Sequence, residues 1–238
     1  MVCEMNTKIT VVIITLNEET NIEKCLRSCA QFDEIIVVDS GSTDKTTDSS
    51  KSYGANVYHQ EWLGFGPQKK YAVSKASNDW ILSIDADEYL SEEVKAAILN
   101  ADFTSIETAY SINRRSFFLG REVKHSGWNP DWVVRLFNRN FANFTDDLVH
   151  ERVTGFSSLQ KLDGLMFHNT YPTLKDVEAK TKTYGLLGQK YRKKKKNRYL
   201  SATWAFLRTF IIKLGILDGL TGLRIALMNA KTTFIKYS

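Results

Sequence analysis

Short apolar strand patterns alternate with helix patterns over the first hundred residues of the chain. Strand patterns cover residues 9–15, 34–39, 56–59 and 80–84, and helix patterns cover 20–30, 44–53, 65–76 and 91–100. Runs such as ITVVIIT are apolar at consecutive positions, as in a strand that is covered on both faces. Because parallel strands need crossover connections, the alternation predicts an α/β fold with a mostly parallel sheet between two layers of helices.

The pattern changes after about residue 105. Residues 108–123, 131–144 and 160–170 have the spacing of antiparallel strands joined by turns, and residues 174–192 have that of a polar helix. We therefore expect an α/β half at 1–105, a second half of the same domain at 106–172, and a helical tail at 173–238. Three cysteines, an odd number, argue against a disulfide scaffold, and no secretory signal pattern is found, so a reducing compartment is expected.

The tail combines a basic cluster with an apolar segment. The cluster runs from Lys190 to Arg198, and the segment that follows is interrupted by charged residues before it could span a bilayer. Two readings stay open: helices packed on the domain, or interfacial helices on an anionic membrane. The residues expected at a membrane are Lys193, Lys194, Lys195, Lys196, Arg198, Trp204 and Phe206. Nucleic-acid binding is electrostatically feasible, but the neighbouring apolar segment favours a membrane.

Acidic motifs follow three of the predicted strands. TLNEE follows the first strand, DSGSTD the second and DADE the fourth. Ligands of parallel α/β folds bind at the carboxyl ends of the strands. Asp85, Asp87 and Glu88 crowd like charges there, which indicates either a solvated turn or a bound cation. Taken together, the motifs fit a diphosphate-bearing substrate with a divalent metal.

Several segments, taken in order, resemble inverting family-2 glycosyltransferases of the GT-A fold: ITVVIITLNEETNIEKCLRS, EIIVVDSGSTDKT, GFGPQKKYAVSKASNDWILSIDADE and LVHERV. The C-terminal FLRTFIIKLGILDGLTGLRIAL is similar to the tail of bacterial lipopolysaccharide-core β-1,4-glucosyltransferases. The resemblance implies a Rossmann-like, mostly parallel sheet, a small antiparallel acceptor-side sheet and C-terminal amphipathic helices. It also implies transfer of glucose from UDP-glucose to a heptose of the inner core.

By this resemblance the first half binds the nucleotide sugar. Asp39 would contact uracil, Asp44 would support its loop, Asp85 would meet the ribose or donor sugar, and Asp87 would bind Mn²⁺ or Mg²⁺. His168 is either a buried, hydrogen-bonded histidine or a further metal ligand. The expected nucleotide and donor residues are Thr15, Leu16, Asn17, Glu18, Asp39, Gly41, Ser42, Asp44, Gln68, Lys69, Asp85, Ala86 and Asp87. A Q-K-N element of the family reads Gln68-Lys69-Lys70 here, so a contact at its third position is in doubt.

The catalytic base is expected in the second half. A single displacement needs a carboxylate that deprotonates the acceptor hydroxyl opposite the leaving group. The candidates are Glu151, Asp147 and Asp131, and Glu151 is preferred because the family places its VHE element by the acceptor. Expected acceptor-side residues are His125, Trp128, Arg135 and His150. Three roles stay open for Arg135: pairing with a phosphate, pairing with a catalytic acid, or a structural ion pair. Trp128 is either a platform for a sugar ring or a packing residue.

The expected partners are a UDP-sugar, a lipid-linked saccharide and the cytoplasmic face of the inner membrane. Sugar-nucleotide synthesis is disfavoured, because TLNEETN lacks the glycine-rich phosphate loop of that class. A non-catalytic nucleotide-sugar or membrane-binding relative, or a family-2 transferase with another donor and lipid-linked acceptor, remains the alternative.

Overall fold

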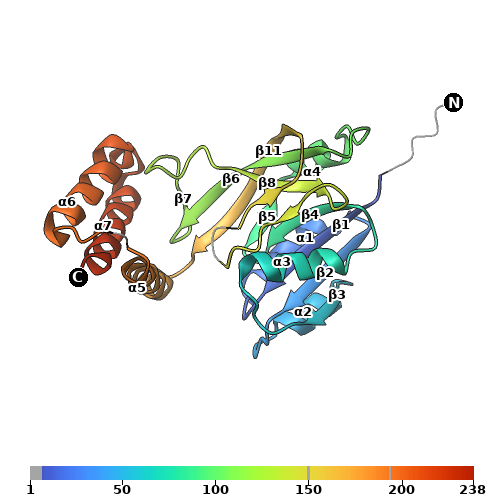
Figure 1. Ribbon diagram of the computed structural model, residues 1–238, viewed down its shortest axis with the longest axis horizontal. Helices are drawn as coiled ribbons and strands as arrows, with labels where there is room; N and C mark the ends of the chain where they lie inside the picture. Colours follow the sequence, from blue (N-terminus) through green and yellow to red (C-terminus); the bar gives the residue numbers. More distant parts are fainter. Residues whose placement is uncertain (1–6, 149–150, 193) are drawn as a thin grey trace. The chain divides into compact units, whose positions relative to one another are not determined.

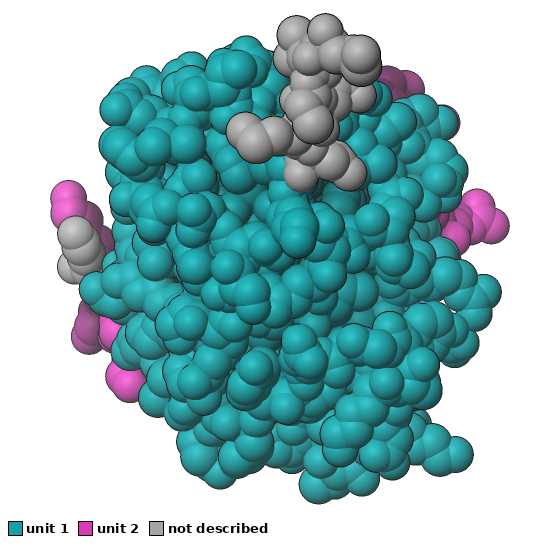
Figure 2. Space-filling model, turned by 90° about the vertical axis from the view of Figure 1, so that its right-hand side faces the viewer, with its two compact units in different colours: residues 1–114, 132–167 teal, residues 115–131, 168–238 magenta. Residues whose placement is uncertain are grey.

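The computed structural model describes residues 7–148, 151–192 and 194–238 (Figure 1). The chain divides into two compact units, which are coloured separately in Figure 2. The first unit consists of Met1–Arg114 and Trp132–Phe167, and the second of Arg115–Asp131 and His168–Ser238.

The first hundred residues form the predicted strand–helix alternation. In chain order the elements are β1 Ile9–Thr15, α1 Ile22–Cys29, β2 Glu34–Asp39, α2 Thr46–Ser52, β3 Asn56–His59, α3 Phe65–Ser74, β4 Trp80–Asp85, β5 Glu88–Leu90 and α4 Glu92–Leu99. The first three strands match their predicted ranges, whereas each helix is two or three residues shorter than predicted. Ser91 shows why: its hydroxyl accepts the amide of Val94 as an N-cap, so the helix begins one residue later.

The central sheet has the order β3-β2-β1-β4-β8-β6-β11-β5, and β7 also pairs with β6. Strands β3, β2, β1 and β4 are parallel neighbours. The remaining strands are β6 Thr108–Phe118, β7 Arg121–Glu122, β8 Trp132–Asn138, β9 Asn143–Phe144, β10 Val153–Thr154 and β11 Ser158–Tyr171. The α/β prediction is confirmed, and β9 and β10 form a separate small antiparallel sheet.

The longer strands of the second half extend the central sheet instead of forming a sheet of their own. Strand β8 pairs antiparallel with β4 on one side and with β6 on the other. This pairing covers the edge that β4 would otherwise expose, and an unpaired edge is a template for aggregation. It also places side chains of β8 beside the end of β4.

Alternate residues of the parallel strands point into two separate cores of the first unit. Val11 and Ile13 pack with apolar residues of α1 and α4, whereas Val12 and Ile14 pack with Ala72 of α3 and with residues of the small sheet. Two-residue periodicity is the geometry of an extended strand. Helix α3, drawn across the strands in Figure 1, is therefore fixed to the sheet by its apolar face.

The second unit has its own small core. Its helical elements are α5 Leu174–Lys190, α6 Arg198–Leu207, the π-helical turn η1 Arg208–Ile212, the 3₁₀ turn η2 Gly215–Asp218 and α7 Gly219–Lys236. Phe118, Val123 and Tyr171 pack against Ile225 and Met228 of α7. Within the described part of the chain, no helix is both long enough and apolar enough to cross a bilayer.

Candidate active site

Side-chain hydrogen bonds join the loops that follow β1 and β2. The amide of Asn17 donates to Ser42 Oγ at 2.8 Å, and Asn17 Oδ1 accepts the amide of Thr43 at 2.9 Å. Asn17 has φ 55°, a left-handed conformation in which asparagine is enriched. The amide of Glu18 donates to Thr46 Oγ1 at 2.8 Å. The two acidic motifs thus form one hydrogen-bonded ridge at the carboxyl ends of the strands.

Asp39 fixes the shape of the second of these loops. It is 4% exposed, and its Oδ2 accepts the amides of Gly41 and Ser42 at 2.9 Å each. Its Oδ1 accepts the hydroxyl of Ser42. Gly41 has φ 100°, a conformation that favours glycine. The carboxylate therefore holds the loop in which a base would bind, and its own contact with uracil stays a prediction.

Two further residues at these strand ends differ in their surroundings. Asp44 Oδ1 accepts the hydroxyl of Thr46 at 2.5 Å and its amide at 3.0 Å, and Oδ2 accepts the amide of Glu19 at 3.2 Å. Burial alone would raise the pKa of Asp44, but these hydrogen bonds lower it overall. Thr15 Oγ1 is buried and has no hydrogen-bond partner among the described residues, while Leu16 is 48% exposed. A buried hydroxyl without a partner marks a position where a ligand can supply one.

Asp85, at the end of β4, has a basic partner on each carboxylate oxygen. Its Oδ1 lies 2.9 Å from Lys69 Nζ, and its Oδ2 lies 2.8 Å from an Arg135 guanidinium nitrogen on β8. The same nitrogen lies 2.6 Å from both oxygens of the fully buried Glu88, which is also 3.2 Å from Arg114. Burial alone would raise the pKa of Asp85, but the charges of Arg135 and Lys69 outweigh burial and hold the pKa well below its usual value.

These pairs change the interpretation of the acidic crowding. Asp85 and Glu88 are neutralised by basic side chains from α3, β6 and β8, so their charges do not require a bound cation. Arg135 is 2% exposed and forms the structural ion pair that was one of its open alternatives, and its place on the acceptor side stays a prediction. Asp87 is half-buried in the turn after β4, and its contact with a metal stays a prediction.

The residues present fit a divalent metal through Asp87 alone. In the described residues, no group of three or more His, Cys, Asp or Glu side chains is placed to hold a metal ion. Magnesium sites commonly use only one or two carboxylates together with substrate phosphates and water. His168 belongs to the second unit, where its Nδ1 lies 3.1 Å from Thr170 Oγ1 and 3.5 Å from Ser116 Oγ. Its pairing with Asp87 stays a prediction.

Glu151 meets the same lysine as Asp85. Its Oε1 lies 2.7 Å from Lys69 Nζ, and its side chain is 15% exposed. Asp147 is exposed and its Oδ2 accepts the hydroxyl of Thr145 at 2.8 Å. Asp131 is half-buried and belongs to the second unit. Glu151 is thus a candidate base that is joined to the network at the end of β4. His150 lies outside the described residues.

Gln68, which precedes Lys69 in α3, reaches the loop after β2. Its Nε2 donates to Ser40 Oγ and to the carbonyl of Gln60, each at 3.0 Å, and the side chain is fully buried. Consecutive residues of one helix therefore contact the loop after β2 and the carboxylate of Glu151.

The second unit holds His125 and Trp128 in a loop fastened by one carboxylate. Asp218 accepts the amide of His125 at 3.0 Å and the hydroxyl of Ser126 at 2.8 Å, and His125 Nδ1 lies 3.2 Å from it. The ring of Trp128 packs on Phe118 and Tyr171, which is the packing alternative left open for it.

The tail residues expected at a membrane are mostly exposed. Lys194, Lys195 and Lys196 are exposed, and Trp204 is 58% exposed. The guanidinium of Arg198 stacks on the rings of Tyr199 and Phe234, and Phe206 stacks on Phe210. Lys193 lies outside the described residues.

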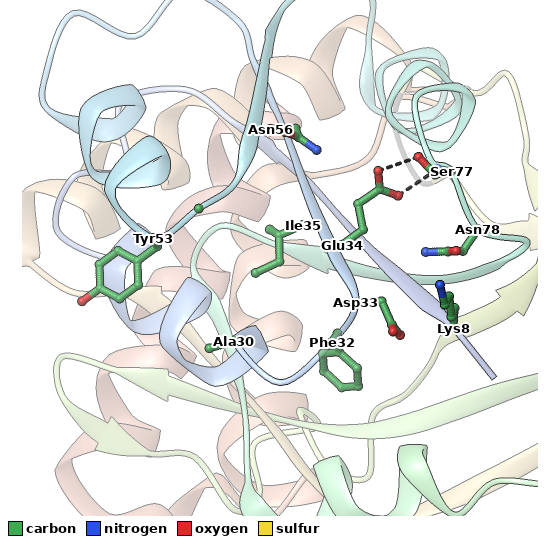
Figure 3. A pocket seen from close by; sticks show the side chains of 11 residues that line it. Lys8, Ala30, Phe32, Asp33, Glu34, Ile35, Tyr53, Asn56, Ser77 and Asn78 are labelled. Carbon is green, nitrogen blue, oxygen red and sulfur yellow. Dashed lines mark hydrogen bonds between the residues drawn. The ribbon is translucent and has the colours of Figure 1, made fainter. Parts of the chain in front are cut away.

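A cavity of about 500 Å³ lies at the opposite edge of the sheet (Figure 3). Lys8, Asp33, Glu34 and Asn78 line it, at the amino ends of the strands. Its carboxylates already have partners: Asp33 accepts the amide of Ile9, and Glu34 accepts the amide and hydroxyl of Ser77. Because the cavity lies at the amino ends of the strands, it is separate from the acidic motifs, which follow the carboxyl ends.

Two members of the network were missed from the sequence. Glu88 was noted in the acidic run but given no role, and Arg114 was predicted only as part of a strand. The signal available was Arg135 inside an apolar strand pattern, because a buried guanidinium requires a carboxylate partner.

Comparisons with known proteins agree with this geometry. Residues 10–162 match the family model described as Glycosyl transferase family 2. The uncharacterized glycosyltransferase RP128 of Rickettsia prowazekii is 31% identical over 249 residues, covering 96% of this chain and 85% of the relative. The lipopolysaccharide core biosynthesis glycosyltransferase LpsC of Rhizobium meliloti is 30% identical over 189 residues, 68% of each chain. The structure of S. aureus TarS 1–349 with UDP-GlcNAc has a TM-score of 0.52 at 17% identity and covers 94% of this chain and 79% of TarS, in line with the predicted GT-A fold.

Proposed function

The chain belongs to glycosyl transferase family 2, and from this premise we propose that it moves a hexose from a UDP-sugar to a saccharide acceptor with inversion. The family resemblance read from the motifs is confirmed, and the protein is a glycosyltransferase. The donor proposed is UDP-glucose, and the acceptor a heptose of the lipopolysaccharide inner core. TarS was crystallised with UDP and UDP-GlcNAc, which supports a UDP-sugar donor, and LpsC is named for lipopolysaccharide core biosynthesis, which supports the acceptor; the choice of glucose follows the motif resemblance.

One observation carries the proposal: Lys69 joins Asp85 at the end of a parallel strand to Glu151 in the second half. A donor-side carboxylate and a candidate base are thereby held within one network. In the proposed reaction the acceptor oxygen forms a bond to the anomeric carbon while the bond from that carbon to the phosphate oxygen breaks. The proton of the acceptor hydroxyl passes to Glu151, and UDP leaves.

A divalent metal would be held by Asp87. When bound, it would neutralise charge on the departing diphosphate. The chain's own residues orient the parts: the ridge formed by the β1 and β2 loops receives the nucleoside, and Asp85 is kept ionised beside the donor by Lys69 and Arg135.

The acceptor is proposed to be lipid-linked, with the enzyme peripheral on the cytoplasmic face of the inner membrane. Residues 190–238 contain twelve lysines and arginines and a single acidic residue, Asp218, whose side chain is only 4% exposed. Large apolar side chains of the same segment are exposed: Leu200, Trp204, Ile211, Ile212, Leu214, Ile216, Leu217 and Leu220. Basic charge next to apolar surface matches an anionic bilayer.

The first test is thermal stability with UDP, GDP, CDP and ADP, each with and without Mn²⁺. A ligand at a hundred times its Kd stabilises the native state by about 2.7 kcal/mol. We expect a shift with UDP and Mn²⁺ that Asp87→Ala abolishes. No shift with any nucleotide would overturn the donor proposal.

Turnover separates the enzyme from its non-catalytic alternative. Glu151→Gln should keep the UDP shift and lose most transfer, because the shape is retained and the base is removed. Normal transfer by this variant would move the base to Asp147 or Asp131. UDP binding without transfer from any UDP-sugar to core saccharides would favour a binding relative.

A further inference from the structure

Helix α3 connects the two sides of the proposed active site through adjacent residues. Lys69 Nζ lies between Glu151 Oε1 and Asp85 Oδ1, at 2.7 and 2.9 Å, although Glu151 is 82 residues away along the chain. We propose that Lys69 is a positioning residue that holds Glu151 for the acceptor and couples it to the donor-side carboxylate. The inference deepens the proposed function, because it takes Glu151 as the base.

The burial of Lys69 makes this contact specific. The residue is 4% exposed, and a buried ammonium is stable only with partners. Its Nζ donates a hydrogen bond to Glu151 and forms an ion pair with Asp85. In the proposed reaction, with Oε1 of Glu151 engaged by Lys69, Oε2 would accept the proton of the acceptor hydroxyl. Arg135 holds the other oxygen of Asp85, so the lysine is fixed from the donor side as well.

The backbone of the segment before Glu151 is also fastened to α3. The amides of Phe65 and Gly66 donate to the carbonyls of Leu148 and Asp147, each at 3.1 Å. Amides in the first turn of a helix have no partner within it, so these carbonyls satisfy them. A Cβ on Gly66 would lie 2.1 Å from the Thr145 carbonyl oxygen, so only glycine permits this approach.

Helix α3 thus holds the candidate base by both its backbone and a side chain. A base acts only within hydrogen-bond reach of the hydroxyl, and a displacement of about 1 Å can cost a hundredfold in rate. Lys69 therefore acts on kcat through Glu151, without contacting the acceptor itself.

The neighbouring lysine provides a matched control. Lys70 pairs with Asp146, which is 81% exposed, and Lys70 itself is 34% exposed. Lys69→Met and Lys70→Met remove the same charge from adjacent positions of one helix. We expect Lys69→Met to lower kcat by about a hundredfold, with KM for the donor changed much less, and Lys70→Met to leave both close to wild type.

The decisive measurement combines Lys69→Met with Glu151→Gln. If Lys69 acts through Glu151, the double variant should be no slower than Glu151→Gln alone. If the two single-variant losses in kcat multiply in the double variant, Lys69 acts independently of Glu151 and the inference is overturned. Wild-type kcat in Lys69→Met would do the same. A fully active Glu151→Gln would instead contradict the proposed base.

Hydrogen exchange tests the inference without turnover, so it is independent of the donor. In Lys69→Met the amides of Phe65 and Gly66 should exchange about tenfold faster, because the segment that accepts their hydrogen bonds is no longer held to the helix by Lys69. Lys70→Met should leave them unchanged. Equal exchange in all three proteins would show that Lys69 does not position this segment.

Discussion

Replacement of Arg135 by methionine should strongly destabilise the first unit. The arginine is 2% exposed and contacts three carboxylate oxygens, two on Glu88 and one on Asp85. Its loss leaves the fully buried Glu88 with Arg114 at 3.2 Å and leaves Asp85 with Lys69 at 2.9 Å. Removing one partner of a buried ion pair typically costs about 3–5 kcal/mol.

The remaining partners place the expected loss at the low end of that range. We expect about 3 kcal/mol for Arg135→Met, a large share of the 5–15 kcal/mol typical of a domain. The matching fall in Tm is about 6–12 °C for a chain of this size. Urea unfolding at pH 7, followed by circular dichroism, measures the free energy and shows through its slope whether unfolding stays cooperative.

A surface arginine gives the control. Arg27 pairs with Glu23 across one helical turn, with side chains 72% and 57% exposed, so Arg27→Met should leave the urea-unfolding midpoint close to that of wild type. The double variant with Glu88→Gln and Arg135→Met should lose less free energy of unfolding than the sum of the losses in the two single variants. A loss below about 1 kcal/mol for Arg135→Met would refute the reasoning.

Three further outcomes are expected. Gly66→Ala should lower the free energy of unfolding by about 1–3 kcal/mol in urea, because its Cβ would lie 2.1 Å from the Thr145 carbonyl oxygen; wild-type stability would contradict this contact. Burial alone would raise the pKa of Glu34, but hydrogen bonds from Thr10 and Ser77 lower it overall, so Glu34 adds stability above its unfolded pKa of about 4.3 and loses it as pH falls through the folded value. The urea-measured gap between wild type and Glu34→Gln should therefore narrow on acidification, and a constant gap would be inconsistent. Trp204→Glu should weaken sedimentation with anionic vesicles at 0.1 M salt, and unchanged sedimentation would remove this face from the membrane contact.

The strand boundaries of the first half could be predicted because local signals define them. Apolar runs end at polar turn residues, and β1, β2 and β3 begin and end where the pattern predicts. The predicted ends of the helices were less accurate. A capping residue such as Ser91 continues the sequence pattern of the helix but lies just outside it.

The partners of the charged residues could not be predicted from local patterns. Lys69 meets Glu151 across 82 positions, and Arg135 meets Asp85 across 50. Both pairs depend on β8 lying beside β4 and on the small sheet covering α3, which are long-range pairings. The sequence therefore indicated which residues carry charge at the strand ends, but not that basic side chains would pair with Asp85 and Glu88.

The contacts of Asp218 mean that the C-terminal region cannot be treated as a detachable anchor. This carboxylate accepts hydrogen bonds from the amides of Lys124 and His125 and from the hydroxyl of Ser126, more than ninety positions upstream. A truncated chain ending near residue 190 would lose the partner of that loop together with the basic, apolar surface. Loss of membrane binding in such a truncation would then report a changed loop as well as a missing surface, so point substitutions on the exposed face are the cleaner way to dissect attachment from catalysis.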